Sequence, residues 1–214
     1  MDASLDNYPK VKETIDSLIK LKSFVDFING YDNIEQLTIQ FEVKKMYNKV
    51  DGQDEPSSAN GACEVDVLNK KVIIRLNEFK HTEDISSQKK QNKTMIAATV
   101  IHEAGHGKAQ ALIIKIGGMQ NITESNAPSL YKYYYYVEKH GMKLDGSVED
   151  NAIHHVAEHD RLTDESLETM LDILMDYDKD NLNQISGSLD REDYKGYMLR
   201  SLEDSSLYKA LTKE

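Results

Sequence analysis

Residues 94–116, which read TMIAATVIHEAGHGKAQALIIKI, decide the fold of this chain. Only Glu103, Lys108 and Lys115 carry a formal charge in this stretch when histidine is counted as neutral. A helix that is apolar almost all round belongs in the interior of a domain, because no face of it favours water. The Gly-Gly pair at 117–118 then ends the helix. We therefore expect a central, buried helix around which the rest of the chain packs.

The segments before this helix predict one further helix and three strands. Residues 9–29 place apolar side chains at helical spacing, and residues 37–43 alternate apolar and polar side chains as a half-buried strand does. Two similar runs, 63–67 and 72–76, flank a short turn and predict a hairpin. Residues 51–61 (DGQDEPSSANG) predict a loop, and they are the best candidate for disorder.

The segments after the buried helix are predominantly helical in pattern. Residues 149–177 predict a helix, residues 189–212 predict one or two short helices, and the aromatic run 129–140 fits either a helix or a strand. This order predicts an α+β fold in which a small antiparallel sheet packs on helices. We expect one domain over residues 1–214, made of an N-terminal helical segment (1–36), strands (37–79), the buried helix (94–116), a second long helix (149–178) and closing helices (189–212).

Composition excludes several classes of protein. The chain has 26 Lys and Arg against 37 Asp and Glu, a formal net charge of -11, so we expect no nucleic-acid partner. No window approaches the roughly 18 apolar residues of a membrane span, and the acidic N-terminus does not look like a secretory signal. We expect a location in the cytoplasm or export by a non-classical, effector-type route. The single Cys63 excludes an internal disulfide and a cysteine-based metal site.

The buried helix contains the pattern H-E-x-x-H at residues 102–106. At about 100° per residue, His102 and His106 lie about 40° apart and one turn above each other, so both imidazoles can reach one metal ion. Glu103 lies beside that ion, where a carboxylate can take a proton from a water that the metal activates. The pattern can also arise by chance. Three ionisable groups inside an apolar helix, however, are costly to bury without a partner such as a metal.

A catalytic zinc site needs a third protein ligand. The helix after residue 149 has an apolar stripe through Leu162, Met170 and Tyr177, and extending this stripe backwards reaches His159 and then His155. His159 is therefore the first choice and His155 the second. The two neighbouring candidates that fall off the stripe are His154 and Glu158.

Residues 94–106 resemble the active-site helix of zincin metallopeptidases. More narrowly, the chain resembles the SprT-like metallopeptidase domains found in Bacteroidetes, often as C-terminal toxin domains of larger secreted proteins. Such domains end a strand with I-x-L-N, as at residues 74–77, and follow a His with an L-x-x-[FY]-D pattern, as His159 is followed by residues 174–178. The family's usual Met is Leu162 here, and residues 193–211 are similar to its closing helices. The resemblance covers roughly residues 72–211 and supports His159 independently.

The resemblance implies a zinc metalloendopeptidase. Zinc would be held by His102, His106 and His159, and Glu103 would act as general base toward the water that attacks a peptide carbonyl. The substrate would be a protein or peptide, and the toxin relationship implies an immunity protein as partner. Tyr133–Tyr136 and Tyr194 are candidate donors to the oxyanion.

A second hypothesis is a non-catalytic binding module that keeps the zincin scaffold and uses the metal for structure alone. Glu103 favours the enzyme, because a structural site has no use for a buried carboxylate beside two histidine ligands. Four protein ligands would favour the structural site.

Overall fold

The computed structural model describes residues 2–29, 37–50, 52–57, 59–81, 93–131, 151–181 and 190–201. Its helices and strands follow in the order η1 (Ala3–Asn7), α1 (Pro9–Leu18), α2 (Lys22–Asn29), β1 (Thr38–Lys44), β2 (Tyr47–Val50), β3 (Gln53–Pro56), β4 (Gly61–Asp66), β5 (Lys71–Asn77), α3 (Glu78–His81), α4 (Lys93–Lys115), η2 (Met119–Asn121), α6 (Asn151–Asn181) and α7 (Arg191–Ser201).

The fold is mixed α+β, as the sequence predicts. One hydrophobic core takes buried side chains from η1, α1, α2, β1, β5, α4, α6 and α7. Most of the polar segment 80–93 and of the aromatic run 129–140 lies outside the described residues. Of the helices that the structure describes, none is both long enough and apolar enough to cross a membrane.

The three-stranded sheet has the strand order β1-β5-β4 and is mixed, so the prediction of an antiparallel sheet is wrong in part. Strands β4 and β5 form the predicted antiparallel hairpin, with Cys63 opposite Ile74. Strand β1 runs parallel to β5, with Phe41 opposite Ile74. Alternating apolar residues show that a strand is half buried, but they do not identify its neighbour or its direction. A parallel neighbour requires a crossover connection, and here that connection contains β2, β3 and β4.

Within the segment 51–61 that the sequence predicts as a loop, residues 53–56 form strand β3. Strands β2 and β3 form an antiparallel hairpin that pairs Tyr47 with Pro56 and turns at Gly52, whose φ is +80°. An ion pair of 2.7 Å joins Lys49 Nζ to Asp54 Oδ1 across it. All eight strand residues are exposed. Because neither face is buried, the sequence has no apolar alternation that would reveal the strands.

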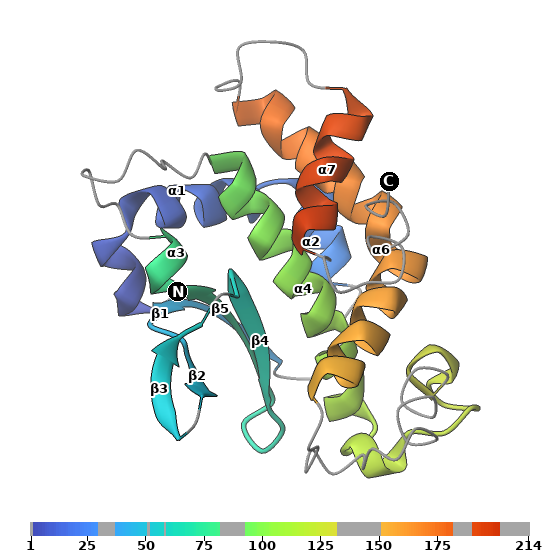
Figure 1. Cartoon of the computed structure of the whole chain (residues 1–214). Helices are drawn as coiled ribbons and strands as arrows, with labels where there is room; N and C mark the ends of the chain where they lie inside the picture. Colours follow the sequence, from blue (N-terminus) through green and yellow to red (C-terminus); the bar gives the residue numbers. More distant parts are fainter. Residues whose placement is uncertain are drawn as a thin grey trace, which may run out of the picture.

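Helix α4 is the predicted buried helix, and it runs between the sheet and α6 (Figure 1). It ends at Lys115, and Gly117 follows with a φ of +80°, a value that glycine adopts without strain. The amide of Gly118 donates to the carbonyl of Ile113 at 2.9 Å and closes the C-terminal turn. The long helix therefore begins and ends close to where the sequence predicts, with one face toward the strands and another toward α6.

The remaining helices follow the predicted pattern with one break. The helix expected over residues 9–29 is divided into α1 and α2 by a turn in which the Leu21 amide donates to the Leu18 carbonyl at 3.0 Å. Apolar spacing continues through this turn to Phe24, so periodicity alone does not show the break. Helix α6 extends the predicted 149–177 helix to Asn181, and α7 accounts for the first part of the predicted segment 189–212.

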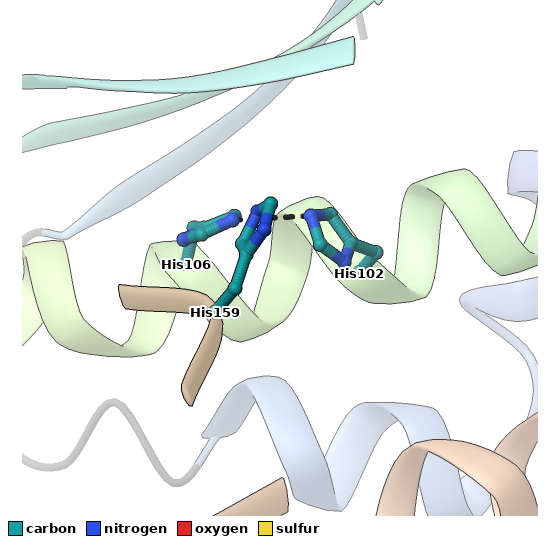
Figure 2. Close-up of side chains that lie close together, drawn as sticks. All are labelled: His102, His106 and His159. Atoms are coloured by element: carbon teal, nitrogen blue, oxygen red, sulfur yellow. Dashed lines mark hydrogen bonds between the residues drawn. The ribbon is translucent and has the colours of Figure 1, made fainter. Parts of the chain in front are cut away.

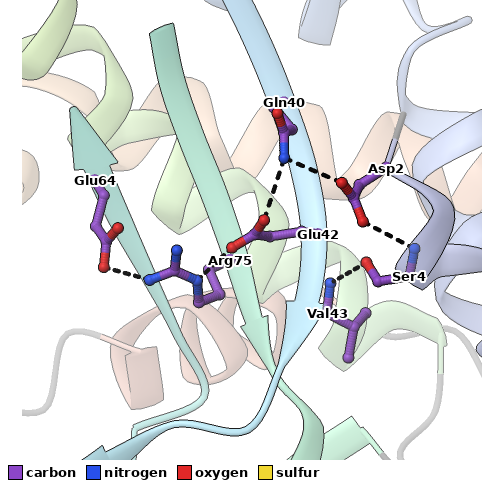
Figure 3. A network of polar contacts seen from close by, with 7 residues as sticks. All are labelled: Asp2, Ser4, Gln40, Glu42, Val43, Glu64 and Arg75. Atoms are coloured by element: carbon purple, nitrogen blue, oxygen red, sulfur yellow. Dashed lines mark hydrogen bonds and ion pairs between the residues drawn. The ribbon is translucent and has the colours of Figure 1, made fainter. Parts of the chain in front are cut away.

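Ion pairs tie the three strands together on the face of the sheet opposite to α4 (Figure 3). Arg75 of β5 bonds to Glu42 of β1, with 2.5 Å between Nε and Oε1, and also to Glu64 of β4. At the β1 edge, the Ser4 hydroxyl accepts from the Val43 amide at 3.1 Å. The N-terminal segment thus covers one edge of the sheet, while Arg75 links the middle strand to both neighbours.

Candidate metal centre

Helix α4 places His102 and His106 one turn apart, as the spacing predicts. Their Nε2 atoms lie 3.1 Å from each other. Both side chains are buried, with 4% and 8% of the residue surface exposed. A buried helix therefore presents two imidazole nitrogens toward one point, which the sequence pattern anticipated from helical geometry alone.

His159 of α6 completes a cluster of three buried imidazoles (Figure 2). Its ring centroid lies 5.2 Å from that of His102 and 5.4 Å from that of His106. One nitrogen of each ring lies within 4.8 Å of the others. The apolar stripe of this helix predicts His159 as the third ligand, and the structure places His159 at the cluster. His155, the second choice, lies in α6, but its side chain is outside the described residues, as are those of His154 and Glu158.

The close approach of α4 and α6 at this cluster depends on Gly105. A Cβ atom at Gly105 would lie 2.8 Å from Cδ2 of Leu162 and 3.4 Å from Sδ of Met170. Leu162 is fully buried and lies one turn after His159 on α6. Glycine is a weak helix former, but at position 105 its small size is needed for packing. It lets α6 come close enough for His159 to reach the α4 histidines.

Glu103 lies beside the cluster and is 5% exposed. Its Oε1 atom is 4.0 Å from Nε2 of His102. On the other side it meets Gly61, the first residue of β4, where a Cβ atom would lie 3.0 Å from Oε1 of Glu103. Gly61 is a residue of the site that sequence reasoning missed. No local pattern marks it, because its significance depends on a helix that begins more than thirty residues later.

The donor set fits a metal ion. Two nitrogens bound at about 2.0–2.1 Å in tetrahedral geometry are roughly 3.3–3.4 Å apart. The His102 and His106 nitrogens, at 3.1 Å, are already near that separation. Three buried imidazoles from two helices are a typical ligand set for a divalent transition metal. Residues His102, His106 and His159 are thus close enough to bind one ion.

Tyr194 is the candidate oxyanion donor whose placement the structure describes, and it lies outside this cluster. Tyr194 donates from its hydroxyl to Oδ2 of Asp178 at 2.6 Å. Asp178 lies on α6 nineteen residues after His159, about 28 Å along the helix. Burial, and then the bond to Asp178, raises the pKa of the Tyr194 phenol. Tyr194 is therefore part of a helix contact and not of the metal centre. Tyr133–Tyr136 lie outside the described residues.

Comparison with protein families, with curated proteins and with solved structures finds no match for this chain. The resemblance to SprT-like metallopeptidases therefore stays a prediction from residues and motifs.

Proposed function

We propose that this protein is a zinc-dependent metallopeptidase with a zincin-like arrangement of its active-site helix. The observation that carries the proposal is the convergence of three buried histidines from α4 and α6, within 4.8 Å of one another, beside the buried carboxylate of Glu103. A histidine cluster alone is compatible with a structural metal. A carboxylate beside it, 4.0 Å from a ligand nitrogen, favours catalysis.

Each residue has a distinct role in the proposed reaction. His102 and His106 hold the ion from α4, and His159 holds it from α6. When bound, the metal supplies a Lewis acid and lowers the pKa of water toward ~7. Glu103 accepts the proton from the attacking water and delivers it to the leaving amine. Its burial keeps the carboxylate away from bulk solvent.

A peptide substrate is favoured by the edge of the sheet next to Glu103. Strand β4 is an outer strand, and in the described part of the chain only β5 pairs with it. Its first residue, Gly61, contacts Glu103. An extended peptide can add to such an edge through main-chain hydrogen bonds. This would place a peptide carbonyl near the general base. A small non-peptide substrate has no main chain that could add to the edge strand.

The deciding experiment measures metal content and peptidase activity in the same protein preparations. Wild type, Glu103→Gln and His159→Ala are purified, analysed for bound metals by mass spectrometry, and assayed on a quenched-fluorescence peptide library. We expect about one zinc per chain in wild type and in Glu103→Gln, and loss of most of it in His159→Ala. The rate of cleavage by Glu103→Gln should be about 10²–10⁴-fold lower than that of wild type.

Two results would overturn the proposal. Zinc without cleavage in wild type, combined with unfolding by a chelator, would establish the structural-metal module instead. No uptake of zinc or another divalent metal would remove the metal centre altogether. A role as a secreted effector domain with an immunity protein is a further proposal, and it rests only on the resemblance to SprT-like domains.

A further inference from the structure

Gly61 begins the edge strand β4 at the point where this strand meets α4. A Cβ atom there would lie 2.8 Å from the carbonyl oxygen of Arg75, 3.0 Å from Cγ of Glu103 and 3.0 Å from its Oε1. Real Cβ atoms essentially never come closer than 3.0 Å to such atoms, so the approach to the Arg75 carbonyl is a clash. The Glu103 atoms, at 3.0 Å, would have to move by a few tenths of an ångström. The Glu103 side chain thus occupies the space that a side chain at position 61 would need.

The glycine is required for space and not for backbone conformation. Gly61 is not among the described residues with positive φ, whereas Gly52, Gly117 and Gly118 are. It lies in a regular strand opposite Leu76. An alanine could adopt this backbone without strain, and it would gain about 0.4–1 kcal/mol from the smaller entropy of the unfolded chain. A net loss of stability would therefore come from contacts of the added methyl group.

We propose that Gly61 is a positioning residue, whose missing side chain lets the Glu103 carboxylate lie beside His102. The inference rests on the proposed function for its catalytic meaning. The three neighbouring atoms differ in how easily they move. The Arg75 carbonyl belongs to the middle strand, which is paired on both sides. The Glu103 carboxylate is the end of a flexible side chain, so it is the group that an added methyl would displace.

Displacement of the carboxylate has a predictable consequence. A shift of about 1 Å in a catalytic group can lower the rate on the order of 10²-fold. The three heavy atoms nearest to an added Cβ belong to Arg75 and Glu103 and not to the histidines, so we expect zinc content to stay unchanged. Gly61→Ala should therefore lower kcat while KM for a short peptide and zinc content stay close to the wild-type values.

The first test needs no activity and uses the full-length protein in a chelator. Melting temperatures are compared for wild type, Gly61→Ala, Glu103→Ala and the double variant, as a double-mutant cycle. We expect Gly61→Ala to lower Tm by about 5 °C in the wild-type background, as overpacking does. In the Glu103→Ala background it should lower Tm by less than about half as much, because the displaced side chain is gone.

Every outcome of this cycle decides the question. An equal loss of Tm in both backgrounds, or failure of both Gly61→Ala proteins to fold, would place the clash at the Arg75 carbonyl and overturn the proposal. If Gly61→Ala fails to fold and the double variant with Glu103→Ala folds, the result supports the proposal. No loss of Tm in either background would also overturn it. Gly196→Ala in α7 is the control for an added methyl group in open space, because a Cβ atom there has no heavy atom within 4 Å. It should not lower Tm, since alanine favours a helix over glycine by about 1 kcal/mol.

The second test measures kcat, KM and zinc content of Gly61→Ala against Gly196→Ala. A fall in kcat of tenfold or more at unchanged zinc content supports the positioning role. Coupling in the melting cycle with an unchanged kcat would show contact without positioning and overturn the role in catalysis. If wild type itself proves inactive, the proposed function fails, and the melting cycle still decides whether Gly61 holds the Glu103 side chain.

Discussion

Gly105 of α4 and Leu162 of α6 lie in direct contact, because a Cβ atom on Gly105 would be 2.8 Å from Cδ2 of the leucine. Gly105 precedes His106, and Leu162 follows His159 by one turn. A close contact between the two helices therefore lies next to two of the three histidines. This contact links helix packing to the geometry of the candidate metal centre.

Gly105→Ala should weaken both stability and metal binding. Overpacking costs about 1–3 kcal/mol, against which alanine gains about 1 kcal/mol in helix propensity. We expect a net loss of about 1 kcal/mol in urea unfolding of the metal-free protein. Wider helix spacing should lower zinc affinity on the order of tenfold, as measured by competition with a chromophoric chelator. Gly196→Ala is the control. Unchanged affinity in Gly105→Ala would show that the contact does not set the ligand geometry.

Metal removal should destabilise wild type and leave the ligand variants unaffected. A ligand present at 100 times its dissociation constant stabilises the folded state by about 2.7 kcal/mol. We therefore expect a chelator to lower the Tm of wild type by roughly 5–10 °C, and to change the Tm of His159→Ala by less than about 1 °C. His155→Ala is the matched variant and should behave like wild type. The opposite pattern would identify His155 as the third ligand.

The sequence predicted the parts of the site that lie on one element or on one helical face. His102, Glu103 and His106 follow from helical spacing, and His159 follows from the apolar stripe of α6. The placement of these residues could be predicted because a helix has a fixed period, so relative positions along it are set by residue number.

Relationships between elements could not be predicted in the same way. The parallel pairing of β1 with β5, the exposed β2–β3 hairpin and the contact of Gly61 with Glu103 all depend on how distant segments meet. Pairing direction leaves no local signal, and an exposed hairpin lacks the apolar alternation that marks a strand. A glycine required by a close approach is identical in sequence to a glycine required by a turn.

The two ion pairs of Arg75 should contribute unequally to stability. The side chain of Glu42 is 16% exposed, whereas that of Glu64 is 53% exposed. An exposed pair is screened by water and salt, and it is worth about 0–1 kcal/mol. We expect Glu64→Gln to lower the free energy of unfolding by less than about 0.5 kcal/mol, and Glu42→Gln by about 1–2 kcal/mol.

Urea unfolding at low salt and at 1 M salt separates the two pairs. The effect of Glu64→Gln should vanish at high salt, because the Debye length there is about 3 Å. The effect of Glu42→Gln should persist, since that carboxylate is shielded from solvent by its neighbours. If Glu64→Gln and Glu42→Gln lose the same free energy of unfolding, and salt changes neither loss, the prediction from side-chain exposure is wrong.

The bond between Tyr194 and Asp178 predicts a loss of stability at high pH. The hydroxyl donates at 2.6 Å to Oδ2 of Asp178, whose Oδ1 accepts at 3.0 Å from the hydroxyl of Thr94. This contact joins α7, α6 and the beginning of α4. Burial and the neighbouring carboxylate raise the pKa of Tyr194 above its ordinary value of 10.0, so the neutral phenol is favoured in the folded state.

As pH rises through 10, the unfolded chain releases this proton before the folded chain does. The stability from Tyr194 is therefore fully present below pH 10 and is lost above it, at up to about 1.4 kcal/mol per pH unit. Tyr194→Phe should lower stability at pH 7 by about 1–2 kcal/mol and make the decline above pH 10 shallower. The measurement is urea unfolding from pH 7 to 11, with Tyr47→Phe, at a half-exposed tyrosine of β2, as control. An unchanged alkaline slope in Tyr194→Phe would mean that this phenol does not stay protonated in the folded protein.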